Sequence, residues 1–250
     1  MTIVGEKDPR LDLAGTPESA WVSARLDQLP ALELGNYRHA VMVAPHPDDE
    51  VLASAGLMQR LASRGIPLTV VSVTDGEASH PTSRTATPAI LTDMRSLELR
   101  QALDYLGLGA RIRRLGLPDG HVAVDVSDLV ACLSKLLAPD VLCVAPWERD
   151  GHPDHDATGH AAARACATTG APFLRSLVWT WHWATPGSDH VPWLRARRLA
   201  LSHVELTRKR WATRSFGSQV TPLSDLPGDE AILPAETLAY FDRPYEVFLA

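Results

Sequence analysis

Short apolar runs alternate with amphipathic segments along most of the chain. Runs rich in valine and leucine predict strands at residues 39–44, 67–74, 111–117 and 140–145. Between them, apolar residues at helical spacing predict helices at about 50–64, 92–108, 126–138 and 154–169. This alternation predicts an α/β fold: a Rossmann-like, mostly parallel sheet with helices on both faces.

The pattern changes at both ends of this region. A helix is expected over 17–28, with Thr16 as its N-cap, and after about residue 171 the runs LVWTWHWATP and RRLALSH predict further strands. In the first of these runs Trp179, Trp181 and Trp183 would share one face, either as core or as a platform for a sugar or acyl group. We expect a single domain: a helical extension (1–36), a core (about 38–220) and an irregular C-terminal segment (220–250).

Composition narrows the range of partners. The 250-residue chain is 45% hydrophobic, has a net charge of −6 and contains no basic block, which disfavours nucleic acid and anionic membranes. No apolar run is long enough for a membrane span, and the first residues lack the apolar stretch of a secretory signal. Three isolated cysteines (Cys132, Cys143, Cys166) suit free thiols in a reducing cytoplasm. We expect a cytoplasmic protein with a small-molecule partner, and the sequence leaves a homo-oligomer open.

Two His-Pro-Asp triplets each follow a predicted strand. The first opens the stretch HPDDE (46–50), and the second opens HPDH (152–155). Acids in a first helical turn also suit the helix dipole, which is the simpler interpretation of each stretch alone. The carboxyl ends of parallel strands meet at one edge of a sheet, so both triplets should lie together there.

The spacing within these stretches predicts a metal site. His46 and Asp49 are three residues apart at a helix start, and His155 supplies a third donor from the second loop. Two imidazoles and one carboxylate leave a fourth position open, as in catalytic zinc sites, although Fe²⁺, Co²⁺ or Mn²⁺ suits the same donors. Asp48 can then act as general base, and a protonated His152, oriented by Asp154, can stabilise negative charge on an oxyanion.

The pairing of PHPDDE with a later GHPDH resembles the signature of the LmbE/PIG-L family of zinc-dependent deacetylases, over roughly residues 38–220. Members remove acetyl from N-acetylglucosaminyl groups on inositol conjugates, antibiotics or small glycosides. The resemblance implies His46, Asp49 and His155 as metal ligands, Asp48 as general base, and His152, oriented by Asp154, as oxyanion stabiliser or general acid. Further family-like positions are Gly76, Glu77, Arg95, Glu98, Leu117–Gly120, Lys209, Ser218 and Gln219.

Two positions depart from this pattern. Asp150 stands where the mycothiol-pathway members carry a tyrosine, and Phe216 stands where a histidine is common. An ionised Asp150 cannot stabilise an oxyanion, so the resemblance does not extend to the acid or the substrate of the mycothiol enzymes.

Three further residues are candidates for substrate binding. Glu77 lies in the loop after the second strand, where a solvated side chain is the alternative, and Asp119 lies in what can also be a simple turn. Arg95 is expected near the start of a helix, either exposed on its surface or in contact with sugar hydroxyls.

Together these features predict a metal-dependent amidohydrolase that removes an acetyl or other acyl group from an amino-sugar conjugate. One alternative is an amidase that cleaves a larger thiol-sugar conjugate. Another is a non-catalytic Rossmann-like binding protein, which is disfavoured because no GxGxxG or Walker loop follows any strand.

Overall fold

The first predicted strand forms as β1 (His39–Ala44), at the centre of the sheet in the computed structural model, which describes Leu11 and residues 13–250. Its parallel neighbours are β2 (Leu68–Ser72) and β4 (Val141–Pro146). Outside these lie β3 (Arg111–Arg114) and β5 (Phe173–Ser176), also parallel. The order of the sheet is β3-β2-β1-β4-β5-β7-β6, so the predicted Rossmann-like, mostly parallel sheet is confirmed.

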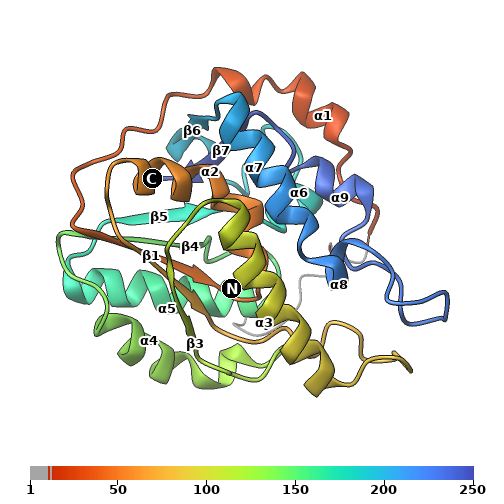
Figure 1. Ribbon diagram of the computed structural model, residues 1–250. Helices are drawn as coiled ribbons and strands as arrows, with labels where there is room; N and C mark the ends of the chain where they lie inside the picture. Colours follow the sequence, from red (N-terminus) through yellow and green to blue (C-terminus); the bar gives the residue numbers. More distant parts are fainter. Residues whose placement is uncertain (1–10, 12) are drawn as a thin grey trace.

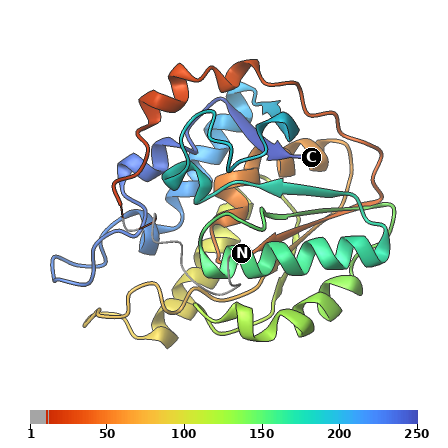
Figure 2. The same ribbon diagram turned by 180° about the vertical axis from the view of Figure 1, so that it is seen from behind.

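Helices cover both faces of this sheet because successive strand residues point to opposite sides. Ala40 and Met42 of β1 pack with α2 (Asp49–Ser63), α3 (Pro88–Tyr105) and α7 (His203–Arg214). Val41 and Val43 pack on the other face with α4 (Val126–Ser134) and α5 (Pro153–Thr169). Figure 1 shows the two groups of helices on either side of the sheet, and Figure 2 shows α4 and α5 from behind.

Several predicted boundaries are wrong by a few residues for local reasons. Helix α3 begins at Pro88 because the side chain of Thr87 accepts a hydrogen bond from the Ile90 N–H. The helix expected over 17–28 is divided into α1 (Glu18–Ser23) and a 3₁₀ turn (Leu26–Gln28), because Arg25 adopts a left-handed conformation. The expected N-cap, Thr16, instead donates a side-chain hydrogen bond to the Ala184 carbonyl.

The sequence suggested an irregular C-terminal segment (220–250), and this is wrong for its last part, whereas residues 221–234 form no helix or strand. The last part contains α9 (Ala235–Ala239) and β7 (Tyr245–Leu249), which pairs antiparallel with β5 on one side and with β6 (Ala196–Ala200) on the other. The last apolar run is therefore an interior strand, and four of its five residues are buried. Its two neighbours, β5 and β6, are separate segments earlier in the chain, so the local sequence gives little indication of this pairing.

The tryptophan-rich run is helical, which overturns the predicted strand. It forms the short α6 (Thr180–Trp183), so its indoles point in different directions rather than along one face. Trp181 is buried and stacks edge-on against Trp21 of α1, with ring centroids 5.1 Å apart. The carboxylate of Asp150 accepts the N–H groups of residues 178, 179 and 180, which satisfies the donors at the start of this turn.

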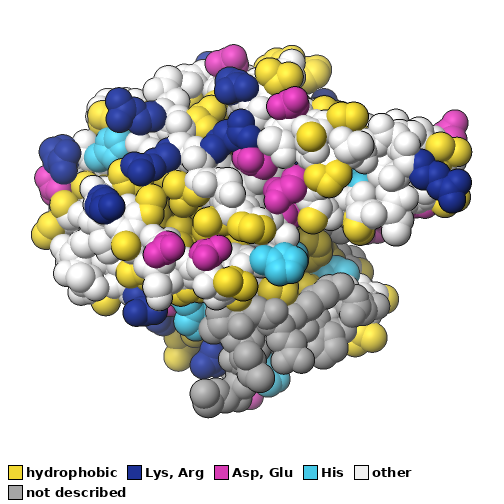
Figure 3. Space-filling view, turned by 90° about the horizontal axis from the view of Figure 1, so that it is seen from below, with side chains coloured by type: hydrophobic (Ala, Val, Ile, Leu, Met, Phe, Trp, Pro, Cys, Tyr) yellow, Lys and Arg dark blue, Asp and Glu magenta, His cyan; other side chains and the backbone are white. Residues whose placement is uncertain are grey.

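The loops that leave the strand ends converge at one edge of the sheet, as predicted. The segments at 75–91 and 221–233 project from the body at this end, as the yellow and blue loops in Figure 1. On the face drawn in Figure 3, acidic and basic side chains are interspersed and do not form one basic field. Among the described residues no helix is both long and apolar enough to cross a membrane.

Candidate metal centre and active site

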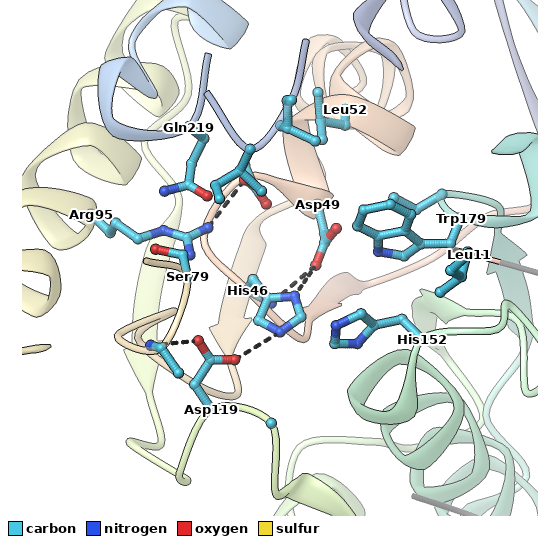
Figure 4. Close-up of a pocket in the computed structure, with 16 residues that line it drawn as sticks. Leu11, His46, Asp49, Leu52, Ser79, Arg95, Asp119, His152, Trp179 and Gln219 are labelled. Atoms are coloured by element: carbon cyan, nitrogen blue, oxygen red, sulfur yellow. Dashed lines mark hydrogen bonds and ion pairs between the residues drawn. The ribbon is translucent and has the colours of Figure 1, made fainter. Parts of the chain in front are cut away.

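A pocket of about 380 Å³ lies at this edge of the sheet (Figure 4). It draws residues from all four strand-end loops, including His46, Ser79, Asp119 and His152. One wall is apolar, and its members are Leu11, Leu52, Val178, Trp179, Ile232 and Leu233. The other walls carry the charged side chains, so the pocket can receive a ligand with both a polar and an apolar side.

Three side chains in or beside this pocket form a potential metal-binding group. Oδ2 of Asp49 lies 3.3 Å from Nδ1 of His46 and 3.3 Å from Nε2 of His155. Asp49 opens α2 and His155 lies in the first turn of α5, so two helix starts bring the donors together. Nε2 of His155 is buried and makes no hydrogen bond to any described residue. A buried nitrogen without a partner beside a carboxylate oxygen fits a metal ligand.

The other nitrogen of each of these histidines faces carboxylates. Nδ1 of His155 lies 2.9 Å from Oδ2 of Asp150, and Nε2 of His46 lies 3.1 Å from Oδ1 of Asp119 and 3.3 Å from Oδ2 of Asp154. Such carboxylates fix the ring orientation and tautomer of histidines that bind metals. This role of Asp150 was not predicted from the sequence, in which the available signal is its position five residues before His155, across the start of α5.

A second group of potential ligands, His46, His152 and Asp154, shares the pocket. Here the donors are already engaged. The carboxylate of Asp154 accepts the N–H groups of Gly120 and Val122 at 2.7 and 3.1 Å. Nδ1 of His152 accepts the N–H of Asp154 at 3.2 Å. The group of His46, Asp49 and His155 is therefore the better metal site.

Asp48 lies directly before Asp49, one of the potential metal ligands, and has a strained conformation. Its φ of 146° is rare for a residue other than glycine, and such strain is typical of functional positions. Oδ2 of Asp48 lies 3.1 Å from Nη2 of Arg95. Burial raises the pKa of Asp48 to about 7, against the opposing effect of the Arg95 charge. A carboxyl group that titrates near neutral pH suits a general base.

Arg95 is not on the helix surface, which was one of the two expectations for it. Its side chain is buried, and its guanidinium donates to the carbonyls of Gly76 and Pro47 as well as to Asp48. A Cβ on Gly76 would lie 1.8 Å from Nη1 of Arg95, and Gly76 also has a positive φ of 67°. Only glycine at position 76 leaves room for this guanidinium, which explains the GE pair noted in the sequence.

His152 and Asp154 are adjacent, but not in the expected way. The carboxylate of Asp154 contacts His46 and the 120–122 backbone rather than the His152 ring. Burial, together with repulsion from His46 and His155, lowers the pKa of His152 to about 3. The structure therefore does not support the expectation of a charged His152 held by the Asp154 carboxylate. With Nδ1 accepting a hydrogen bond, a neutral His152 carries its proton on Nε2.

The remaining candidates, Glu77 and Asp119, hold their loops together. Oε1 of Glu77 accepts the Asp119 N–H at 3.0 Å, and Oδ2 of Asp119 accepts the Ala78 N–H at 2.8 Å. Asp119 lines the pocket, whereas Glu77 is not among its lining residues. Trp179 lines the pocket too, with its ring stacked on His152 at a centroid distance of 5.9 Å. Of the three tryptophans, it is the one that reaches this site.

Phe216 is fully buried in the core, against α2 and α3. The side chain that reaches the pocket from this segment is Gln219, at the end of the short α8 (Gly217–Val220). Glu98 of α3 accepts both the N–H and the hydroxyl of Ser218, which positions Gln219. This contact accounts for the Glu98 and Ser218-Gln219 positions noted in the sequence.

Comparison with known proteins agrees with this arrangement. The PIG-L family model, described as GlcNAc-PI de-N-acetylase, matches residues 41–166, just over half of the chain. A probable N-acetyl-α-D-glucosaminyl L-malate deacetylase 2 of Bacillus anthracis is 35% identical over 140 residues, which span 53% of this chain and 61% of that protein. A 1D-myo-inositol 2-acetamido-2-deoxy-α-D-glucopyranoside deacetylase of Segniliparus rotundus is 28% identical over 231 residues, 75% of this chain and 71% of that protein.

Among solved structures, the zinc-inhibited form of teicoplanin deacetylase Orf2 has the same fold, with a TM-score of 0.59. It covers 73% of this chain and 85% of its own, at 19% identity. The chain spans about three fifths of the length of the Bacillus relative. Residues 41–166, which the family model matches, include both His-Pro-Asp loops. The matched region thus contains all three potential ligands, and the chain belongs to the PIG-L family.

Proposed function

We propose that the protein hydrolyses the N-acetyl amide of an amino-sugar conjugate, which releases acetate and a free amine. The observation that carries this proposal is the meeting of His46, Asp49 and His155 beside a buried Asp48 in one pocket. The names of its relatives, which are deacetylases of N-acetylglucosaminyl compounds, support the substrate class.

We propose a divalent metal, Zn²⁺ in the first place, at His46 Nδ1, Asp49 Oδ2 and His155 Nε2. Two nitrogens and one oxygen suit Zn²⁺, and the same donors also suit Fe²⁺, Co²⁺ or Mn²⁺. A bound metal would supply a Lewis acid for the amide carbonyl and would lower the pKa of water.

In this proposal Asp48 carries out both proton transfers. Asp48 accepts a proton from the attacking water, since its carboxylate is next to the ligands and is not needed as one. Arg95 holds the Asp48 carboxylate in place through the 3.1 Å ion pair. After attack, the protonated Asp48 can return the proton to the leaving amine.

His152 is placed to assist as a neutral donor. Its Nδ1 accepts the Asp154 N–H, so its Nε2–H is available to the oxygen that gains negative charge. In this role Asp154 acts through its backbone on His152 and through its carboxylate on His46. Both residues stay in the proposed catalytic set, with these revised contacts.

The substrate contacts are also revised. Because Arg95 and Glu77 are engaged with the protein itself, we assign them to positioning, whereas Asp119 remains a pocket-lining candidate. Ser79 and Gln219 offer polar groups inside the pocket, and the Trp179 indole offers a flat apolar surface for a sugar ring. The three free cysteines support a reducing, cytoplasmic location.

The test is release of both products from a panel of N-acetylglucosaminides by the metal-loaded protein. Equal amounts of acetate and primary amine are the expected result, with loss of turnover on metal chelation and recovery on Zn²⁺ addition. Cleavage confined to larger thiol-sugar conjugates would favour the alternative amidase. Saturable sugar binding without any product would favour a non-catalytic binding protein.

A further inference from the structure

A second and larger pocket, of about 520 Å³, lies beside the 146–154 loop. Its lining shares no residue with the pocket that holds the metal-binding group. The lining residues are Trp147, Glu148, Arg149, His160, Ala163, Arg164, Arg175, Asp189, His190, Pro192 and Arg195. Its volume is in the range of small-molecule sites.

Four arginines from four separate segments meet in this pocket. Arg149 follows β4, Arg164 lies on α5, Arg175 on β5 and Arg195 at the end of a 3₁₀ turn (Trp193–Arg195). With the two acids in the lining, the pocket has a formal charge of +2 (4 − 2) when its histidines are neutral, in a chain whose net charge is −6. Gathering like charges in a concavity costs free energy that a bound anion would offset.

Most of this positive charge is not used within the protein. Arg175 makes a bidentate pair with Glu148, at 2.8 and 2.9 Å. Arg195 donates only its Nε–H, to the Ala250 carbonyl. Among the described residues, neither the Arg149 nor the Arg164 guanidinium has a hydrogen-bond or ion-pair partner. Two whole guanidinium groups and part of a third are therefore available to a ligand.

Trp147 adds an indole group to the lining of this pocket. Trp147 lines the pocket but is only 7% exposed, and its ring stacks against Trp183 with centroids 6.4 Å apart. The indole N–H of Trp147 has no hydrogen-bond partner among the described residues, and its nitrogen does not belong to the fully buried, unpartnered polar atoms. It is therefore an accessible neutral donor in the same lining as the guanidinium groups.

We propose that this pocket is a second ligand site, for the phosphate group of a small phosphate monoester. Guanidinium groups bind phosphate oxygens in a bidentate way, and the volume leaves room for an organic group beside the phosphate. This inference does not depend on the proposed deacetylation. The pocket and the metal-binding group flank one loop: Trp147–Arg149 line the pocket, and the next residue, Asp150, contacts His155.

Calorimetry with glucose 6-phosphate and with glucose tests the site on the metal-loaded full chain. Both probes carry the same sugar, so only the phosphate distinguishes them. We expect saturable binding of glucose 6-phosphate that weakens as salt rises, and no such binding of glucose at this site. Equal binding of both probes would overturn the proposal.

Variants locate the site. The double variant Arg164→Gln/Arg195→Gln should weaken binding of glucose 6-phosphate by about 10-fold or more, because hydrogen bonds between charged groups are lost. Arg111→Gln, which removes an exposed arginine from β3, is the matched control and should bind as the parent does. His155→Ala should also bind as the parent does. If His155→Ala abolishes binding, or if the double variant binds normally, the phosphate is not held in this pocket.

Discussion

Oδ2 of Asp150 lies 2.9 Å from Nδ1 of His155, and both side chains are completely buried. The same carboxylate accepts the N–H groups of residues 178–180 and the hydroxyl of Thr180. One acid therefore links a proposed metal ligand to the segment that carries Trp179. Asp150, which stands where the mycothiol-pathway members carry a tyrosine, therefore has a structural role of its own.

Asp150→Asn should weaken metal binding by about 10- to 100-fold, because the carboxylate that orients and polarises His155 is lost. Competition with a metal chelator measures the affinity. Asp156→Asn is a matched control: Asp156 is a buried acid on α5, the helix of His155, and its carboxylate accepts the Gly151 N–H at 2.9 Å. If both variants bind the metal as tightly as the parent, Asp150 does not support the ligand.

His155→Ala should leave the purified protein with far less than one metal per chain, because one of three donors is missing. Elemental analysis gives the metal content directly. His203→Ala, which removes an exposed histidine at the start of α7, should keep full occupancy. Full occupancy in His155→Ala would rule out the proposed ligand set.

Asp48→Asn should separate metal binding from chemistry. The amide keeps the shape of the side chain but cannot accept a proton, so turnover should fall by roughly 10²–10⁴ while metal content is retained. Steady-state kinetics and elemental analysis on the same sample check both parts. Near-normal turnover would remove Asp48 from the proposed mechanism.

Arg95→Ala should lower both kcat and stability. The substitution leaves the Asp48 carboxylate buried without its cation, and breaking a buried pair in this way costs about 3–5 kcal/mol. Denaturant unfolding measures the stability, and kinetics separate kcat from KM. A rise in KM alone would return Arg95 to the role of substrate contact.

A pair of glycine variants tests the same guanidinium without removing it. Gly76 and Gly65 both have positive φ, at 67° and 75°, but only at Gly76 would a Cβ meet Arg95. Gly65→Ala should cost about 1 kcal/mol from backbone strain and leave activity unchanged. Gly76→Ala should cost more and reduce activity. Equal effects of the two substitutions would show that Arg95 can move freely.

Glu205 should contribute stability that depends on pH. Hydrogen bonds from Arg60 lower its pKa to about 2, from an ordinary value of 4.5, and it also closes the capping box of α7 with Ser202. Between these two pH values the unfolded chain binds more protons, so the contribution is complete above about pH 4.5 and is lost as pH falls toward 2. The difference in Tm between the parent and Glu205→Gln should shrink over this window. A difference that stays constant would contradict the assignment.

The sequence by itself determined the part of the fold that depends on local pattern. Strand β1 and the helices α2 and α5 lie where the valine-rich runs and the amphipathic spacing predict them. The two His-Pro-Asp triplets each follow a strand, so a parallel sheet had to place both at the same edge. They lie close together because β1 and β4 are neighbours in the sheet. The grouping of His46, Asp49 and His155 followed from that geometry.

Tertiary structure decided which neighbours these residues have. The partners of Asp150 are residues 178–180, those of Arg95 come from two loops, and β7 inserts between strands much earlier in the chain. Such contacts join segments far apart in sequence, and no local periodicity records them. The tryptophan run became helical for the same reason: burial against Trp21 and capping by Asp150 outweighed its alternating pattern.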